Sequence, residues 1–509
     1  MNTAYGKKLL LELKESGDLA RQGIVFRTAE NKYLYDTGTG KVVLLDETSA
    51  PIINALLDTS IDLPSFSSLL VSDETANSIA DFFQAEHLLC APLITHFVDP
   101  RLLMSENNLQ CEQLIIELTG KCNLRCKYCT YNDYFEQTRA FNDLFINFET
   151  AKKAIDYAYS HRSKKSFAIS FYGGEPLLNF SVMRKCIEYC LTKYSDVKTA
   201  FAFTTNLTLM THEIAEYLAQ VPNMNIVVSI DGPEKIHNQN RIFANGSPSF
   251  EAAFRGFKNL CKAADRYGNI SIHINSVLMP PYTEERFTEI NDFFESLTKI
   301  APPETTVSAT YPLTGSIPHS FVEELKQKGY KTNEDVSWLE WASRKAREIN
   351  DLPSMPNLFT DLMRKYLGDI YHRRLVDAPM DKYCWNGCCV PGNRRLYVCT
   401  DGTYKVCEKM GEVPSIGHVD TGIDFGIVKS VYIDQYENAS IGDCSNCWAI
   451  NLCDVCYSLC YAEQGIDIKR KRELCPETRQ TALSKLCLYH EMMETNPSII
   501  EKISLLERT

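Results

Sequence analysis

Strand-like and helical segments alternate strictly between residues 113 and 310, and this alternation constrains the fold more than any other feature of the 509-residue sequence. Apolar runs typical of strands lie at 114–118, 167–171, 200–204, 226–230, 270–277 and 306–310. Helical spacing separates them, for example at Ala151, Ala154, Ile155 and Ala158. Such alternation indicates parallel βαβ units. We predict an α/β fold, and because six units are fewer than the eight of a closed TIM barrel, a partial (β/α)6 TIM-like barrel.

Three cysteines follow the first of these strands in the segment GKCNLRCKYC, namely Cys122, Cys126 and Cys129. Ligands bind at the carboxyl ends of the strands in parallel α/β folds. A zinc site needs a fourth Cys or His nearby, and the nearest downstream histidine, His161, lies beyond a predicted helix. Three small core residues are not expected among the basic residues of this segment. The spacing therefore favours a [4Fe–4S] cluster with three protein ligands, which leaves one iron open for another molecule.

The spacing of these cysteines, with Tyr128 before the last one, resembles that of the radical S-adenosylmethionine (SAM) enzymes. The resemblance implies that the open iron binds SAM and that electron transfer cleaves SAM to a 5′-deoxyadenosyl radical, which abstracts a substrate hydrogen. The segments YGGEP, TTN, SIDGP and HNQNR follow in the family's order, so the resemblance covers roughly residues 112–310. The cofactor-binding residues that it implies are Tyr128, Gly173, Gly174, Glu175, Thr205, Asn206, Ser229, Asp231 and Arg241.

The resemblance also implies roles for some of these residues. The glycines of YGGEP let the backbone approach a ligand closely. Glu175 is expected to meet the SAM amine or to hold its own loop. Ser229 and Asp231 are expected to bind ribose hydroxyls or to support a loop, and Arg241 is expected to meet the SAM carboxylate. GGEP alone is also compatible with a simple turn, and SIDGP with a helix start.

Twelve of the twenty cysteines lie between Cys384 and Cys487. Disulfides are not expected in a cytosolic chain, and zinc ribbons built from C-x₂-C pairs are one alternative. The spacing from Cys389 through Gly402 to Cys407, followed by a dense series from Cys444, resembles the SPASM extension of radical SAM peptide maturases. That resemblance implies two auxiliary [4Fe–4S] clusters. A cluster there also suits the chemistry, because bond closure on a substrate radical releases one electron.

The resemblance assigns the auxiliary ligands only in part. The first cluster takes Cys384, Cys389, Cys407 and one of Cys456 and Cys460. The second takes Cys444, Cys447, Cys453 or Cys456, and Cys475. One cysteine is in excess, so the choice among Cys453, Cys456 and Cys460 stays open. Glu408 occupies the place of an acidic residue proposed as a base in related enzymes, so it is the catalytic candidate; a solvated carboxylate beside Lys409 is the alternative.

The first 105 residues differ in pattern from the rest. Strand-like runs at 23–27 and 41–45 flank the turn-rich segment DTGTG, and a helix with Ser49 as N-cap and a second helix at about 74–86 follow. This resembles the winged-helix-like (RRE-like) domain that binds leader peptides, commonly as an added strand. The expected domains are 1–105 for leader recognition, 110–310 for the radical SAM core, 311–380 for a helical bridge, 381–490 for the SPASM domain and 491–509 for a C-terminal tail.

The net charge of −12 argues against binding nucleic acid through its phosphates. No apolar signal segment and no run of about 20 apolar residues is present, so we expect a cytoplasmic protein without membrane contact. The expected function is a radical SAM peptide maturase that forms cysteine thioether crosslinks in a leader-bearing precursor peptide, with a flavodoxin- or ferredoxin-type electron donor. The alternatives are carbon–carbon crosslinking, anaerobic sulfatase maturation to formylglycine, and an iron–sulfur electron-transfer protein without enzymatic activity.

Overall fold

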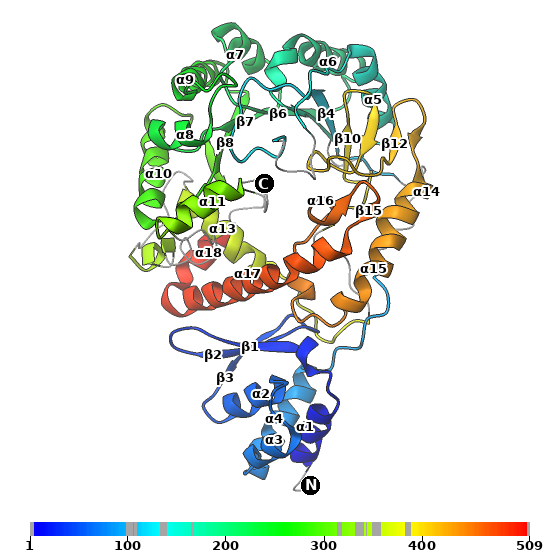
Figure 1. Cartoon of the computed structure of the whole chain (residues 1–509), viewed down its shortest axis with the longest axis vertical. Coiled ribbons are helices and arrows are strands. Elements are labelled where there is room, and N and C mark those ends of the chain that lie inside the picture. Colours follow the sequence, from blue (N-terminus) through cyan, green and yellow to red (C-terminus); the bar gives the residue numbers. More distant parts are fainter. Residues whose placement is uncertain are drawn as a thin grey trace.

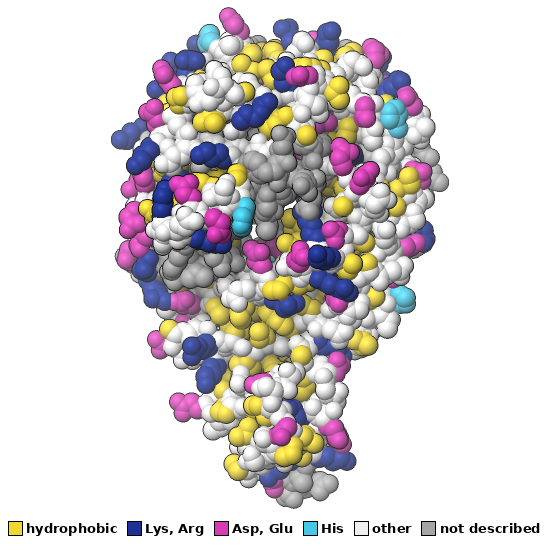
Figure 2. Space-filling model, in the orientation of Figure 1, with side chains coloured by type: hydrophobic (Ala, Val, Ile, Leu, Met, Phe, Trp, Pro, Cys, Tyr) yellow, Lys and Arg dark blue, Asp and Glu magenta, His cyan; other side chains and the backbone are white. Residues whose placement is uncertain are grey.

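Figure 1 shows a computed structural model of the protein. The structure describes residues 5–97, 105, 109–132, 140–163, 167–312, 318–330, 341–342, 344–348, 358–381 and 388–505. A small N-terminal domain, blue in Figure 1, projects from a larger body that curves around a central opening in the ribbon. On the face in Figure 2, basic and acidic side chains are interspersed over the described surface, and no large basic patch appears there.

The N-terminal domain combines one antiparallel sheet with four helices. Its sheet has the order β1 (Gly23–Arg27), β2 (Lys32–Asp36), β3 (Val42–Leu45). Its helices are α1 (Tyr5–Glu15), α2 (Ser49–Leu57), α3 (Leu63–Leu69) and α4 (Asp73–Glu86). Strand β2 was not expected, because its sequence KYLYD lies in what the sequence suggested was a connection. The N-cap of α2 is Thr48, so the prediction of Ser49 was wrong by one residue.

All six predicted strands of the larger body are confirmed as parallel neighbours. They are β4 (Gln113–Thr119), β5 (Phe167–Gly173), β6 (Thr199–Thr205), β7 (Met224–Ser229), β8 (Ile270–Val277) and β9 (Thr306–Thr310). Within the described residues they belong to a ten-stranded sheet of order β13-β12-β11-β10-β4-β5-β6-β7-β8-β9. The fold is thus α/β with a large parallel sheet, as predicted.

The C-terminal segment contributes the other four strands of this sheet. Strand β10 (Arg395–Val398) pairs in parallel with β4, and buried Leu396 lies opposite buried Leu114. The antiparallel strands β11 (Thr403–Lys405), β12 (Gly417–His418) and β13 (Gly422–Ile423) then extend the sheet. The predicted six parallel strands therefore become seven, and the cysteine-rich segment shares the sheet of the core.

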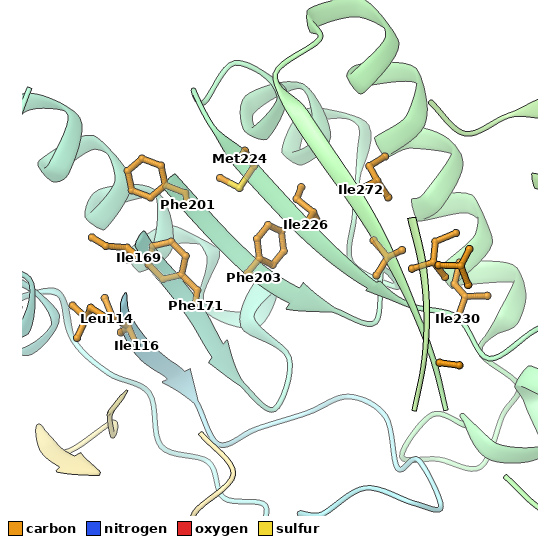
Figure 3. Packing of buried hydrophobic residues seen from close by; sticks show 14 of the residues in the cluster. Leu114, Ile116, Ile169, Phe171, Phe201, Phe203, Met224, Ile226, Ile230 and Ile272 are labelled. Atoms are coloured by element: carbon orange, nitrogen blue, oxygen red, sulfur yellow. The ribbon is translucent and has the colours of Figure 1, made fainter. Parts of the chain in front are cut away.

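Helices cover the outer face of the parallel sheet (Figure 1). They are α5 (Phe148–Ser160), α6 (Phe180–Lys193), α7 (His212–Ala219), α8 (Glu234–Asn240), α9 (Phe250–Tyr267) and α10 (Glu284–Ser296). Figure 3 shows side chains of adjacent strands packed together, among them Phe171, Phe203 and Ile226. Ala154 of α5 and Ile187 of α6 belong to the same buried cluster, so the core lies between the sheet and the helices.

The remaining helices connect the core to the C-terminal region and to the N-terminal domain. They are α11 (His319–Gln327), α13 (Leu358–Tyr371), α14 (Phe425–Ile427), α15 (Gln435–Cys444), α16 (Tyr457–Cys460), α17 (Ile468–Thr495) and α18 (Pro497–Leu505); a short ribbon β14 (Tyr461–Ala462) and β15 (Gly465–Ile466) precedes α17. The helix predicted near residues 338–349 lies partly outside the described residues. Among the helices that the structure describes, none is both long and apolar enough to cross a membrane.

Candidate active site

A cavity of about 360 Å³ opens at the carboxyl ends of the parallel strands. Its wall contains most of the residues that the sequence suggested: Cys122, Cys126, Tyr128, Cys129, Gly173, Gly174, Glu175, Thr205, Asn206, Ser229, Arg241 and Glu408. Asp231 does not line this cavity. The structure therefore brings together side chains that are up to 286 positions apart, from Cys122 to Glu408 (408 − 122 = 286).

The loop after β4 places the three thiols at this cavity. The Lys127 N–H donates to the Asn240 carbonyl at 2.9 Å, which holds the loop against the end of α8. Burial raises the pKa of Cys122 and Cys126 to about 12, so these thiols need a nearby positive charge to ionise. Among the described residues, no three metal-binding side chains are grouped closely enough for a single metal ion. Three thiols that line one cavity are the donor set that iron–sulfur clusters take, so these residues fit such a cluster.

The two glycines of YGGEP allow the strand end to touch the cysteine loop. Gly173 has φ +130, and a Cβ added there would lie 2.1 Å from the Thr119 carbonyl oxygen. A Cβ on Gly174 would lie 2.2 Å from the Lys121 carbonyl oxygen. In this close packing the Gly174 N–H donates to Thr119 O at 2.9 Å. Only glycine fits at these positions.

Glu175 holds its own loop, which was one of its two predicted roles. Its carboxylate is 1% exposed and accepts three hydrogen bonds: from the Leu177 N–H at 3.1 Å, the Thr205 hydroxyl at 2.8 Å and the Asn206 N–H at 2.7 Å. The Asn206 side chain in turn donates to Asn123 Oδ1 at 2.8 Å. Glu175 therefore joins the ends of β5 and β6 to the cysteine loop.

Tyr128, Asp231 and Arg241 form a hydrogen-bonded polar group at the cavity wall, in which Asp231 and Arg241 are buried and Tyr128 is partly buried. The Tyr128 hydroxyl donates to both Asp231 carboxylate oxygens at 2.9 Å, and Arg241 Nη1 donates to that hydroxyl at 2.6 Å. Burial raises the pKa of Asp231, although Arg241 opposes that shift. Asp231 thus supports the loops, whereas Arg241 also lines the cavity. The Arg241 Nε atom is buried without a hydrogen-bond partner in the structure, so this guanidinium retains a donor near the cavity.

Glu408 and Lys409 reach the cavity from the C-terminal segment. The Glu408 side chain is 14% exposed, and its Oε1 lies 3.7 Å from Arg395 Nη1. The alternative of a fully solvated Glu408 is therefore wrong. Sequence reasoning missed Asn275 and Tyr311, which also line the cavity. Their position at the ends of β8 and β9 was the available signal.

A second cavity of about 400 Å³ lies in the cysteine-rich region. Four of the predicted ligands line it: Cys444, Cys447, Cys453 and Cys475. Lys471 of α17 also lines this cavity, and its ammonium donates to Cys444 Sγ at 3.1 Å. The four thiols come from the end of α15, the following loop and α17, and they form a donor set of the kind that holds iron–sulfur clusters.

Two of the other predicted ligands, Cys389 and Cys456, lie near Cys407. Burial and Glu408 raise the pKa of Cys407 to about 12, and the nearby thiols Cys456 and Cys389 act in the same direction. Cys460 is fully buried and lies beside Cys388, a cysteine without a predicted role. Cys384 lies outside the described residues.

The sequence of most of the strands and loops that form the main cavity matches a known protein family. Residues 116–294 match the radical SAM superfamily. This chain has a radical SAM domain. Proteins of this superfamily bind a [4Fe–4S] cluster and SAM, so the predictions of a radical SAM domain, of the α/β fold and of a cluster that binds SAM are confirmed.

Several known proteins are similar to this chain in sequence or in structure. The chain is 29% identical to an uncharacterized protein of Methanocaldococcus jannaschii over 61% of this chain and 89% of that protein. It is 26% identical to the radical SAM cyclopropyl synthase TigE of Paramaledivibacter caminithermalis over 38% of this chain and 41% of TigE. The structure of native anSMEcpe with bound AdoMet and Kp18Cys peptide matches at TM-score 0.52 and 17% identity, over 77% of this chain and 99% of that chain. At that identity the structural match shows the shared fold.

Proposed function

We propose that this protein is a radical SAM peptide maturase that installs crosslinks, as cysteine thioether bonds, in a leader-bearing precursor peptide. The observation that carries the proposal is the open edge of the N-terminal sheet. In the described part of the chain, β3 pairs on one side with β2 and has no strand on the other. Leu44 on this edge strand is 59% exposed. An extended peptide can add to such an edge as a further strand.

The position of the N-terminal domain supports a role in substrate delivery. Thr37 Oγ1 donates to the Trp448 carbonyl at 2.8 Å, and Asn451 Nδ2 donates to the Thr37 carbonyl at 2.7 Å. Trp448 and Asn451 lie between Cys447 and Cys453. The sheet that would bind the leader is therefore attached directly to the cysteine-rich region. The peptide bound in the anSMEcpe structure supports a peptide as the substrate class.

Residues of the main cavity have separate tasks in this proposal. Cys122, Cys126 and Cys129 hold the cluster that, together with SAM, supplies the 5′-deoxyadenosyl radical. Arg241 and Ser229 bind SAM through its carboxylate and ribose. Glu408 takes the proton that a cysteine thiol of the peptide releases on bond formation. Each crosslink would remove two hydrogens from the peptide: carbon would lose a hydrogen atom to the 5′-deoxyadenosyl radical, sulfur would lose a proton to Glu408, and the remaining electron would pass to an auxiliary cluster.

The cysteine positions support an assignment of the auxiliary ligands. We assign Cys444, Cys447, Cys453 and Cys475 to the second cluster, because all four line one cavity. The first cluster takes Cys389, Cys407 and Cys456, together with Cys384. Cys460 then becomes the excess cysteine. A flavodoxin- or ferredoxin-type protein is the proposed electron donor.

Anaerobic coexpression with a cysteine-containing precursor peptide tests the function, the natural candidate being a short peptide encoded beside this gene. Mass spectrometry should show a loss of two hydrogens per crosslink, and alkylation should show that one cysteine thiol is blocked for each. The Cys126→Ala variant should leave the peptide unchanged. A peptide that loses hydrogens but keeps all its thiols would indicate carbon–carbon crosslinking instead.

A sulfatase-derived peptide tests the alternative activity, formylglycine formation, which the sequence similarity to anaerobic sulfatase-maturating enzymes suggests. We expect the enzyme to leave a Ser- or Cys-type sulfatase peptide unmodified. A variant whose β3 edge is blocked should lose activity on the leader-bearing peptide. Formylglycine in the sulfatase peptide, made equally well by that variant, would contradict the proposed function.

A further inference from the structure

Lys471 is a buried cation inside the second cysteine cavity. It lies in the first turn of α17, and its residue exposure is 3%. Its Nζ atom donates to Cys444 Sγ at 3.1 Å and lies 5.5 Å from the centre of the Tyr436 ring. Lysine is almost never buried without a partner, because its ammonium loses its hydration. The position therefore requires negative charge nearby.

The available negative charge comes from thiols and not from carboxylates. In the described part of the chain, Lys471 has no carboxylate within ion-pair distance, whereas its neighbour Arg472 pairs with Asp443 at 2.7 Å. The cavity walls around Lys471 carry Cys444, Cys453 and Cys475. Thiolates bound to iron would supply the negative charge that no nearby carboxylate of the described residues provides to this ammonium. A buried lysine that contacts cysteine sulfur thus has the features of a group that interacts with a cluster.

We propose that Lys471 sets the reduction potential of the second auxiliary cluster. This inference rests on the proposed function, because it requires a cluster on Cys444, Cys447, Cys453 and Cys475. Gaining one electron makes a cluster more negative, so a buried positive charge beside it favours the reduced form. Hydrogen bonds to the sulfur ligands and net charge are established determinants of cluster potentials. Lys471 is therefore a positioning residue, which acts through Cys444 and does not touch the substrate.

The test is a potentiometric titration of the anaerobic holoenzyme, followed by electron paramagnetic resonance. The signal of the second auxiliary cluster is identified by its loss in Cys453→Ala. We expect Lys471→Met to shift its midpoint to a more negative potential, because Met keeps the length of the side chain without its charge. Lys471→Arg should stay close to the wild type. Lys469→Met is the matched control, since it removes an exposed charge of the same helix from a residue that does not line the cavity, and it should cause little shift.

The outcomes separate this inference from the function on which it rests. An unshifted midpoint in Lys471→Met, or equal shifts in the Met and Arg variants, would overturn it. If Lys471→Met fails to take up the cluster, the iron content of Lys471→Arg decides whether the charge matters. Iron retained in Lys471→Arg supports a role of the positive charge. Iron lost in both variants contradicts that role. If Cys453→Ala has the full iron content of the wild type, the proposed ligand set itself is wrong.

Discussion

Glu175 is held at the candidate active site by donors on three sides of its carboxylate. The Leu177 and Asn206 donors are backbone N–H groups, which cannot reverse their role. A carboxylate can accept all of these bonds, whereas an amide of the same shape cannot. The hydrogen-bond donors of this loop therefore require a carboxylate at position 175.

Replacing Glu175 by Gln should destabilise the protein by about 1–3 kcal/mol, because its NH₂ group would face a buried N–H donor. The affinity for SAM should fall as the loop loosens. Thermal unfolding and calorimetric SAM titration measure the two effects. Glu188→Gln is the control, since Glu188 forms an exposed pair with Arg184. Equal melting temperatures for the Glu175 and Glu188 variants would contradict the role of Glu175.

Replacing Gly173 by Ala should abolish SAM binding. The new Cβ would lie 2.1 Å from the Thr119 backbone, and the φ of +130 is unfavourable for alanine. The matched control is Gly368→Ala in α13, where an added Cβ meets nothing within 4 Å; this variant should be as stable as the wild type or more stable by up to about 1 kcal/mol. Equilibrium dialysis with labelled SAM provides the measurement. Normal SAM binding by Gly173→Ala would show that the predicted contact is wrong.

Strand β3 is the element on which the proposed recognition depends. Asp36 N donates to Lys41 O at 2.9 Å, and the antiparallel register continues with Leu34 opposite Val43. Hydrogen-bonded pairs alternate along such a ladder, so the N–H of Leu44 points away from β2, toward the open edge. This backbone group therefore faces the side of β3 on which a peptide strand would add.

Leu44→Pro should remove that donor and leave the ladder to β2 intact, because proline is tolerated on edge strands. We expect the affinity for a leader peptide to fall at least about tenfold, which corresponds to about 1.4 kcal/mol. Leu93→Pro, at another exposed leucine of the same domain, is the control. Fluorescence anisotropy with a labelled leader peptide measures binding. Unchanged affinity in Leu44→Pro would rule out strand addition at β3.

At the scale of the whole molecule, one carboxylate of α17 accepts three hydrogen bonds from the N-terminal domain. Glu494 Oε1 accepts from Tyr33 OH at 2.7 Å, Asn31 Nδ2 at 2.8 Å and Thr28 Oγ1 at 2.9 Å. Buried Phe26 and Tyr35 of the sheet pack with Leu486 of the same helix. The proposed delivery of substrate by the domain would depend on this attachment.

Glu494→Ala should increase hydrogen exchange in β1 and β2 and leave SAM binding unchanged. Glu473→Ala, at an exposed position of the same helix, is the control. Burial opposes ionisation of Glu494, but its hydrogen bonds outweigh this effect and lower its pKa. Its contribution is therefore complete above the ordinary glutamate pKa of about 4.3 and is lost as the pH falls through the lower folded value. Exchange in β1 and β2 that is equal in both variants would show that Glu494 does not hold the domain.

The sequence by itself determined the parallel sheet and the residues around its open end. Six strands were predicted correctly because each carries a local signal: β4 and β5 are nearly continuous buried runs, and in β6 to β9 buried residues largely alternate with partly buried ones. Cys122, Gly173 and Arg241 were found because the short motifs around them resemble those of the radical SAM family and occur in the same order.

Only the tertiary structure decided which distant segments meet. β10 joins β4 across more than 270 residues, Glu408 reaches the main cavity, Asp231 turns inward to Tyr128, and Lys471 enters the second cysteine cavity. Each of these contacts depends on long-range packing. Its free energy depends on two segments that are distant in the sequence, and a local sequence pattern in one segment does not reveal the other. Cys453 and Cys456 are an example. Their spacing in the sequence fits either cluster, but in the structure Cys453 lines the second cysteine cavity and Cys456 lies near Cys407.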